Sequence, residues 1–227
     1  DRDKGAHVIM VGGDEVWDAA SMAAELDVRD ISCWWQPEGG APRVVAGPRT
    51  GYPAVAFEQM NAELADSIRQ AAVEGLGDIE GKTVWDLYGG VGDTAKILAA
   101  LGAEVWTVDS DKSAVEWGSA RAADADSQGA RVHWVNDRVE EAVPRLPRPN
   151  LVVVNPPRVG LGSKLVRWLQ RWGESADHAR MAYVSCDPAT LARDLAGMPA
   201  FRVEKLTAYD LFPQTAHVET LTVLEAA

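Results

Sequence analysis

The sequence predicts an α/β fold in which helices cover both faces of a doubly wound, mostly parallel sheet. Three observations support this. Strand-like and helix-like segments alternate over about 170 residues, starting near residue 57. The segment Leu151-Val152-Val153-Val154 is wholly apolar, as expected for a central strand buried on both faces. A Gly-rich turn at 89–92 follows one strand-like segment and precedes a helical pattern, as in nucleotide-binding folds.

The regular elements follow one another in a simple order. The apolar patterns predict strands at 83–87, 104–109, 131–135, 151–154 and 181–185. They predict helices at 57–76, from the Gly-rich turn to about 101, at 112–124, between 154 and 181, and at 189–195. The last two segments, 201–208 and 218–225, are interpreted as a strand pair that adds an antiparallel C-terminal strand to the sheet.

The first 50 residues do not follow this alternation. They contain a strand-like segment at 7–11, a helical pattern at 14–26 with Asp14 as N-cap, and strand-like pieces at 31–50. We therefore expect a partial α+β subdomain at 1–50, a linker near 51–56, and the main domain at 51–227. About 50 residues are marginal as an independent fold, and there is no initiator Met, so we expect the chain to begin part-way through a longer protein.

Composition excludes several classes of protein. Hydrophobic residues make up 47% and charged residues 25% of the 227, which is unlike a disordered tail or a coiled coil. The formal net charge of −12 argues against a nucleic-acid-binding protein, whose surface is usually basic. This charge is uneven: residues 1–113 carry 9 Lys and Arg against 20 Asp and Glu, while residues 114–227 carry 13 against 14.

Cysteine content and targeting signals indicate a cytoplasmic protein. Two cysteines, Cys33 and Cys186, cannot form a disulfide framework or supply the four thiolates of a structural metal site. We expect no metal, no transmembrane helix and no signal peptide, because long apolar runs are missing and the N-terminus is charged. Cys33 precedes Trp34 and Trp35 and is interpreted as a packing residue. We expect a monomer.

The Gly-rich turn is a candidate cofactor site. Gly89, Gly90 and Gly92 allow a sharp turn and a close approach of the backbone to a ligand, which phosphate, dinucleotide and adenosyl groups would all fit. Asp109 ends the next strand, where a carboxylate can accept hydrogen bonds from both ribose hydroxyls. The sequence has no Gly-Lys-Ser/Thr, and the turn is flanked by Asp86 and Asp93, which disfavours phosphate. An acidic turn suits a cationic ligand such as S-adenosylmethionine; the alternative is a tight structural turn.

Two further residues could contact the same ligand. Asp137 follows the third predicted strand and could reach the adenine end, or it could be a solvated loop acid. Tyr88 could contact the ligand, pack in the core, or do both.

Three C-terminal segments carry chemically useful side chains after predicted strands. They are Asn155-Pro156-Pro157-Arg158, Ser185-Cys186-Asp187-Pro188, and the segment from Phe212 to Glu219. A thiolate at Cys186 would need nearby positive charge, for which Arg158 and Arg193 are candidates; a buried structural cysteine is the alternative.

The third segment places Glu219 before the apolar residues 220–224 and His217 in a setting more typical of a structural histidine.

One chemistry uses a thiol, a carboxylate and a cofactor methyl group together. Attack of a thiolate on carbon 6 of a pyrimidine makes carbon 5 nucleophilic enough to take the methyl group. A base then removes the carbon-5 proton and the thiolate leaves. Cys186 would be the nucleophile and Glu219 the base.

In combination, these segments resemble the RNA uracil-C5 methyltransferases, which make 5-methyluridine in tRNA or rRNA. The resemblance covers about residues 50–227 and rests on five motifs in order: Phe57-Glu58-Gln59-Met60-Asn61, the turn from Asp86 to Asp93, Asn155-Pro-Pro-Arg158, the segment from Ser185 to Asp194, and Phe212-Pro213-Gln214-Thr215-Ala216-His217-Val218-Glu219. It implies a Rossmann-like, class I S-adenosylmethionine-dependent methyltransferase with an RNA substrate. It also implies cofactor contacts at a set of seven residues: Gln59, Tyr88, Gly90, Asp93, Asp109, Asp137 and Asn155.

The sequence departs from the family pattern at two positions. Asn155 replaces the usual Asp and loses its charge, and Gly89 replaces a Cys, which we expect to be harmless. Family members also usually carry an N-terminal RNA-binding domain, and residues 1–50 resemble only the end of the family's central domain.

Three other functions are compatible with parts of the pattern. Asn155-Pro-Pro could bind the planar amine of an adenine-N6 or glutamine methyltransferase, but this leaves Cys186 and Glu219 unexplained. A non-catalytic RNA-binding remnant would fit the acidic charge. Cytosine-C5 enzymes lack the His-Val-Glu ending. The nearly neutral half holds several cations that we expect around the chemistry, so the net charge does not exclude weak, salt-dependent RNA binding: Arg158, Lys164, Arg167, Arg171, Arg180 and Arg193.

Overall fold

The structure is a computed structural model that describes residues 6–13, 21, 24, 31–40, 42–47, 62–123, 131–211, 214–215 and 217–227. The chain divides into two compact units, Asp1–Phe57 and Glu58–Ala227. Gln59 and most of the helix expected at 14–26 lie outside the described residues, although Ser21 and Ala24 are helical.

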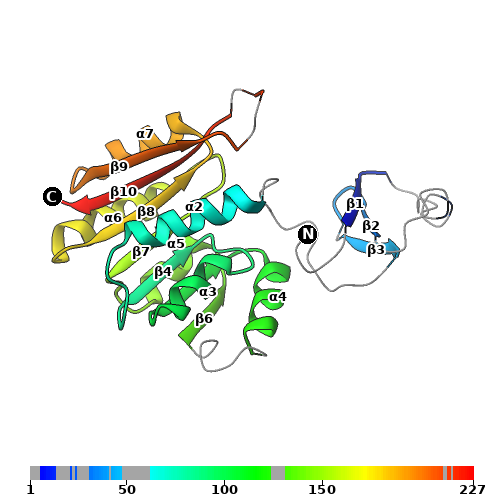
Figure 1. Cartoon of the computed structure of the whole chain (residues 1–227), viewed down its shortest axis with the longest axis horizontal. Helices are drawn as coiled ribbons and strands as arrows, with labels where there is room; N and C mark the ends of the chain where they lie inside the picture. The colour runs from blue at the N-terminus through cyan, green and yellow to red at the C-terminus, as the bar shows by residue number, and fades with distance from the viewer. Residues whose placement is uncertain are drawn as a thin grey trace. The chain divides into compact units, whose positions relative to one another are not determined.

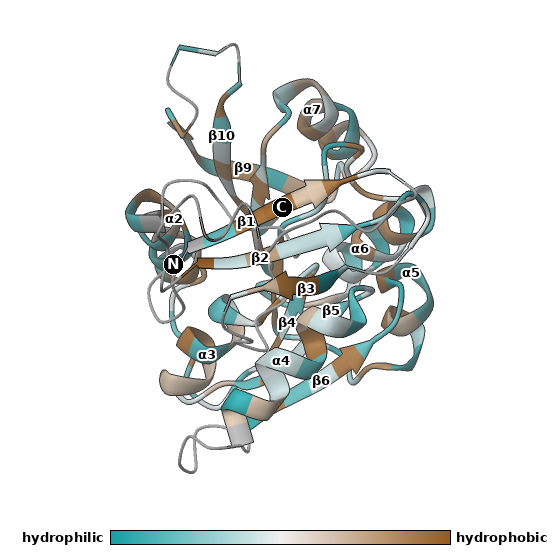
Figure 2. Cartoon of the chain, turned by 90° about the vertical axis from the view of Figure 1, so that its right-hand side faces the viewer, coloured by the Kyte–Doolittle hydropathy of each residue, from teal (hydrophilic) through white to brown (hydrophobic). Residues whose placement is uncertain are grey.

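The first unit contains a three-stranded sheet. Its strands are β1 (Ala6–Val11), β2 (Ile31–Gln36) and β3 (Arg43–Ala46), with β2 in the middle, parallel to β1 and antiparallel to β3. Figure 2 shows that β3 is mostly hydrophobic. Cys33 is only 1% exposed in β2, and the indole N–H of Trp35 donates to the carbonyl of Gly12 at 2.8 Å. The interpretation of Cys33 as a packing residue is therefore confirmed.

The second unit is built on a seven-stranded sheet of order β6-β5-β4-β7-β8-β10-β9. Its strands are β4 (Thr83–Leu87), β5 (Glu104–Asp109), β6 (Val132–Asn136), β7 (Leu151–Val154), β8 (Arg180–Ser185), β9 (Phe201–Tyr209) and β10 (Glu219–Ala226). The first five are parallel to one another, and β10 runs antiparallel to both β8 and β9. Figure 1 shows β6 at one edge and the β9–β10 hairpin at the other. The predicted sheet, including its antiparallel C-terminal strand, is confirmed.

Helices connect the strands and cover both faces of the sheet. They are α2 (Ala62–Gly75), α3 (Asp93–Ala100), α4 (Lys112–Ala123), α5 (Val139–Ala142), the 3₁₀ turn η2 (Val143–Arg145), α6 (Ser163–Ser175) and α7 (Pro188–Ala196). Residues alternate across the sheet: Leu151 and Val153 join the core with α2 and α3, whereas Val152 and Val154 join the core with α6 and α7. Neither α5 nor η2 was predicted, because helices of four and three residues are too short to show a periodic apolar pattern.

The connectivity creates a topological switch point at the carboxyl ends of the parallel strands, the carboxyl edge of the sheet. From β4 the chain proceeds outward through β5 and β6, then returns to the other side of β4 as β7. Ligands of open α/β sheets bind beside the carboxyl ends of the strands at such a switch point. Since β10 is antiparallel to β8, its first residue lies at the same edge as the last residue of β8.

A buried carboxyl group lies in β4, one residue before its carboxyl end. Asp86, in β4, is 2% exposed and accepts a hydrogen bond from the Thr107 hydroxyl at 3.1 Å. Burial is the main cause that raises the pKa of Asp86 to about 7; the charges of Asp109 and Asp93 also raise it, while the Thr107 hydrogen bond opposes the shift. The folded protein therefore holds a proton at Asp86 that the unfolded chain releases near pH 4.

Replacing Asp86 by Asn should make the free energy of unfolding less dependent on pH. Because the folded-state pKa is raised, this group is neutral in both states below about pH 4 and destabilises the fold as the pH rises towards 7. A shift of about three pKa units corresponds to about 4 kcal/mol. Urea unfolding between pH 4.5 and 8 should show the variant gaining stability over the wild type with increasing pH. Asp78→Asn, at an exposed position, is the control, and parallel profiles for Asp86→Asn and the wild type would contradict the prediction.

Candidate active site

Six of the nine predicted site residues lie at the carboxyl edge of the second unit's sheet. Each follows or ends a parallel strand, or begins the antiparallel one: Tyr88 after β4, Asp109 in β5, Asp137 after β6, Asn155 after β7, Cys186 after β8 and Glu219 in β10. Gly90 and Asp93 belong to the turn after β4 and the start of α3. Gln59 lies outside the described residues. The edge rule applied to the sequence thus brings together residues that are up to 131 positions apart.

The Gly-rich turn is fixed by Asp109. Gly90 and Gly92 have φ angles of +55° and +75°, which glycine adopts without strain, and Tyr88 also has a positive φ of 61°. One carboxylate oxygen of Asp109 accepts the N–H of Gly90 and the other accepts the N–H of Asp111, both at 2.8 Å. Asp109 therefore shapes the turn, and its role towards a ribose stays a prediction.

Gly89 is required by its neighbours. A Cβ at this position would lie 2.1 Å from the Thr107 hydroxyl oxygen and 2.6 Å from a carboxylate oxygen of Asp86. The Gly in place of the family's Cys is therefore matched to Thr107, whose hydroxyl occupies the space.

Gly89→Ala should lower the free energy of unfolding by about 1–3 kcal/mol, because an added methyl group overpacks the turn. Thr107→Ala in the same chain should recover part of this loss, giving a favourable coupling of about 1 kcal/mol. Denaturant unfolding of the wild type, both single variants and the double variant measures the coupling. Thr222→Ala, a buried threonine in β10, is the matched control and should combine additively with Gly89→Ala. Additive losses for Gly89→Ala and Thr107→Ala would contradict the prediction.

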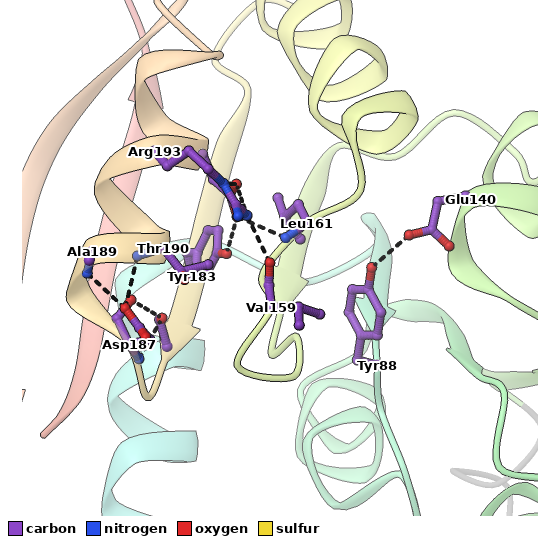
Figure 3. A network of polar contacts seen from close by, with 11 residues as sticks. Tyr88, Glu140, Val159, Leu161, Tyr183, Asp187, Ala189, Thr190 and Arg193 are labelled. Carbon is purple, nitrogen blue, oxygen red and sulfur yellow. Dashed lines mark hydrogen bonds and ion pairs between the residues drawn. The ribbon is translucent and has the colours of Figure 1, made fainter. Parts of the chain in front are cut away.

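Two carboxylates that follow β6, Asp137 and Glu140, have hydrogen-bond partners. Asp137 accepts its hydrogen bonds from the backbone N–H of Arg138 and from the Arg145 guanidinium, and in that order they lower its pKa. It is thus ion-paired and not a lone solvated acid. The Tyr88 hydroxyl donates to Glu140 at 3.2 Å, and burial followed by the Glu140 charge raises the pKa of Tyr88 (Figure 3). Tyr88 also packs against the core, so its ring has a structural role.

Cys186 and Glu219 are neighbours across the β8–β10 pair. Ser185, the last residue of β8, is paired with Thr220 in the antiparallel register, so Cys186, which follows β8, comes opposite Glu219. Thr220 also donates its hydroxyl to the Ser185 carbonyl at 3.0 Å. Glu219 is buried, at 2% exposure, and the Cys186 thiol is partly exposed. Burial, and then the Glu219 charge, raise the pKa of Cys186, whereas the charge and hydrogen bonding of Arg158 lower it.

The turn after Cys186 is rigid. Asp187 caps α7: one of its carboxylate oxygens accepts the N–H groups of Ala189 and Thr190, both at 2.9 Å (Figure 3). Pro188 occupies the first helical turn, where its missing N–H is not needed. The Ser185 hydroxyl accepts the N–H of Asp187 at 3.2 Å. These bonds hold the thiol at the junction of a strand and a helix.

The segment after β7 supplies the cation next to the thiol. The backbone N–H of Asn155 donates to the Leu87 carbonyl at 3.2 Å and so links the carboxyl ends of β7 and β4. Asn155 itself is exposed. Of the two cations expected near the thiol, Arg158 lowers its pKa, and Arg193 is not among the largest causes of the shift. Arg193 bonds Asp194 and the Val159 carbonyl, so its role towards the thiol stays a prediction.

Two other cations expected around the chemistry lie at the opposite edge. Arg180 is the first residue of β8 and pairs with Glu204 and the Gly75 carbonyl. Arg171 lies near the end of α6, which runs away from the carboxyl edge. Because Arg180 precedes the predicted strand at 181–185, the sequence could have placed it at the amino end of that strand, away from the chemistry. The burial of Asp194 was not predicted. The sequence could have indicated it, because this carboxylate lies on the same helical face as the apolar residues Leu191, Leu195 and Met198.

The described residues contain neither a metal centre nor a membrane-spanning helix. None of their groups of His, Cys, Asp and Glu has the arrangement of a metal centre. Within the same part of the chain, no helix combines the length and apolar character needed to cross a membrane.

Comparisons with known proteins find related RNA methyltransferases. The family described as "tRNA (Uracil-5-)-methyltransferase" matches residues 146–227. An uncharacterized RNA methyltransferase of Streptomyces coelicolor is 40% identical over 178 residues, which are 75% of this chain and 37% of that protein. The 23S rRNA (uracil(747)-C(5))-methyltransferase RlmC of Escherichia coli is 28% identical over 222 residues, or 95% of this chain and 52% of that protein. The chain thus spans about half or less of the length of these curated relatives.

A solved structure shows the same fold. The tRNA (uracil-54, C5)-methyltransferase of Pyrococcus abyssi, in complex with S-adenosyl-L-homocysteine, superposes with a TM-score of 0.66 at 22% identity, covering 98% of this chain and 57% of that one. The chain therefore has the Rossmann-like fold of the class I methyltransferases, a class that uses S-adenosylmethionine. Within this class, residues 146–227 match the RNA uracil-C5 methyltransferase family.

Proposed function

We propose that this chain carries the methyl-transfer centre of an enzyme that methylates carbon 5 of uracil in RNA. The observation that supports this most strongly is the juxtaposition of Cys186 and Glu219 at the carboxyl edge, in the register of β8 and β10. A thiol beside a buried carboxylate, at the same carboxyl edge as a Gly-rich turn, would provide a nucleophile, a base and a cofactor site on one side of the sheet. The amino-group methyltransferase reading uses neither Cys186 nor Glu219.

The residues around the turn suit a cationic adenosyl cofactor. The backbone is open at Gly90, where an added Cβ would meet no atom within 4 Å, and Asp93 is exposed in the first turn of α3. Aspartates at the ends of β5 and β6 and the Asn155 amide offer polar contacts around this opening. We assign cofactor contacts to the full predicted set: Gln59, Tyr88, Gly90, Asp93, Asp109, Asp137 and Asn155. When bound, the cofactor supplies an electrophilic methyl group.

The chain's own residues then perform covalent catalysis. The Cys186 sulfur, as thiolate, bonds to carbon 6 of the uracil, and the electron pair of the 5,6 double bond moves into the ring as an enolate. Carbon 5 would then accept the methyl group that a cofactor held by the assigned residues would supply. The Glu219 carboxylate removes the proton from carbon 5, the double bond forms again, and the sulfur leaves as thiolate. Arg158 favours the thiolate at the beginning and end of this cycle.

We propose that the RNA presents its uridine flipped out of the stack. Cys186 lies at a sheet edge, and its partly exposed thiol can reach carbon 6 only when the base leaves its neighbours. Two of the described cations near the carboxyl edge already have partners: Arg158 faces the thiol, and Lys164 pairs with Glu141 at 3.2 Å. This chain should therefore bind RNA weakly on its own, with an affinity that falls with salt.

Incubation with 5-fluorouridine RNA and S-adenosylmethionine tests the proposal. Fluorine cannot leave carbon 5 as a proton, so a covalent protein–RNA adduct should accumulate and survive denaturing electrophoresis. Transfer of labelled methyl groups to unmodified RNA, with nucleoside analysis for 5-methyluridine, is the second measurement. Methylation of an adenine amine or of a protein glutamine without an adduct would favour the amino-group enzyme. Binding of RNA with neither adduct nor methylation would favour a non-catalytic protein.

A further inference from the structure

A third buried carboxylate, besides Asp86 and Glu219, lies in the helix that follows Cys186. Asp194, in α7, is 2% exposed and accepts hydrogen bonds from three separate segments. The Tyr183 hydroxyl of β8 and the backbone N–H of Leu161 both donate to one oxygen at 2.8 Å. The Arg193 guanidinium donates to the other oxygen at 2.7 and 3.0 Å. Figure 3 shows Tyr183, Leu161 and Arg193 close to one another.

These bonds fasten the loop that carries Arg158. The loop leaves β7 after Asn155 and enters α6 at Ser163, and Asp194 holds it at Leu161 while Arg193 holds it at Val159 through the carbonyl at 2.8 Å. Gly160 lies between these anchors with a φ of +74°, and a Cβ there would be 2.5 Å from the Asp194 carboxylate. The approach of the loop to α7 is therefore as close as a glycine permits, with anchors on the residues directly after Arg158.

We propose that Asp194 is a positioning residue that holds this loop against α7 and thereby keeps Arg158 beside Cys186. The effect of Asp194 on catalysis rests on the proposed function, whereas its effect on the position of Arg158 does not. Tyr183 also belongs to β8, whose end leads into Cys186, so the same carboxylate ties both the nucleophile's strand and the cation's loop to one helix. An ionised carboxylate accepts all of these donors, whereas an amide would direct its own N–H groups at one of them.

The charges around the thiol set the expected readout. Glu219 faces Cys186 from β10 and Arg158 faces it from the loop, with opposite effects on its pKa. Asp187, the next residue, also lies near Arg158, and its pKa is lowered first by the N–H of Thr190. If the loop loosens, Arg158 withdraws while Glu219 stays in its strand. The pKa of Cys186 should then rise further.

The test is the pH dependence of Cys186 alkylation by iodoacetamide, followed by peptide mass spectrometry so that Cys33 is read separately. Asp194→Asn should raise the midpoint by roughly one pH unit, and Tyr183→Phe, which removes one donor at nearly constant volume, should raise it less. Arg158→Ala sets the reference shift, and Asp194→Asn should add nothing to it in the double variant. Glu225→Gln, which removes a carboxylate paired with Arg202 at the other end of β10, is the matched control.

The outcomes separate this proposal from the proposed function. Titration needs neither RNA nor cofactor, so it reports on Asp194 even if no RNA is methylated. A wild-type midpoint in Tyr183→Phe and in folded Asp194→Asn overturns the proposal. Equal shifts of Asp194→Asn with and without Arg158 also overturn it, because they would show a general structural effect. If Asp194→Asn does not fold, the pair Tyr183→Phe and Arg158→Ala gives the same cycle.

Discussion

Replacing Cys186 by Ala should abolish the adduct with 5-fluorouridine RNA and reduce methyl transfer by about 10⁴-fold or more. The loss is this large because Cys186 is the one cysteine of the second unit, and without a bond at carbon 6 the uracil carbon 5 is a poor nucleophile. Cys186→Ser should behave almost the same, since a hydroxyl beside Glu219 is far less ionised than a thiol. Electrophoresis of the adduct and counting of transferred methyl groups measure both effects.

Cys33→Ala is the matched control for this experiment. Cys33 is the other cysteine of the chain, and it is buried in β2. Its removal should leave adduct formation and the kinetics of methyl transfer unchanged, apart from a small loss of stability. An undiminished adduct in Cys186→Ala would assign the covalent bond to another residue. Binding of S-adenosylmethionine should be retained in Cys186→Ala, which separates lost chemistry from lost cofactor affinity.

The sequence could predict the site because its residues are tied to strand ends. Cys186 follows an apolar strand, and Glu219 begins another, so their shared edge depends only on the direction of the strands. Asp109 could be placed in the same way. The register of Ser185 with Thr220, which makes Cys186 and Glu219 neighbours, required the structure, because a shift of one residue would have turned Glu219 to the other face.

Side-chain partners were beyond the sequence for a physical reason. A charged residue on a helix is usually solvated, so Arg193 was a candidate cation for the thiol, and Asp194 was noted only as the last residue of a motif. The fold instead buries Asp194 against Tyr183 and draws Arg193 to it as the counter-ion. In the same way, burial converts Asp86 from a member of an acidic turn into a group with a pKa of about 7. Such effects depend on which elements meet, and local patterns do not specify that.

Glu219→Gln should trap the methylated adduct on ordinary, unfluorinated RNA. The first bond and the methyl transfer need Cys186 and the cofactor, whereas release needs the carbon-5 proton to be taken, and a neutral amide takes it poorly. Turnover should fall by about 10²–10⁴-fold while labelled methyl groups appear in a denaturation-resistant complex. The amide also removes the charge that raises the pKa of Cys186, so formation of the adduct should not be slowed.

This result would distinguish a base from a merely structural carboxylate. Glu219 is buried, and Gln has nearly the same shape, so a folded variant with slow release and intact adduct formation isolates proton removal as the lost step. Glu225→Gln, in the same strand but at its other end, should turn over normally. The double variant Cys186→Ala/Glu219→Gln should form no complex, since the trapped species requires the sulfur. Rapid turnover by Glu219→Gln would instead assign proton removal to another group at this edge and leave Glu219 as a neighbour that tunes the thiol.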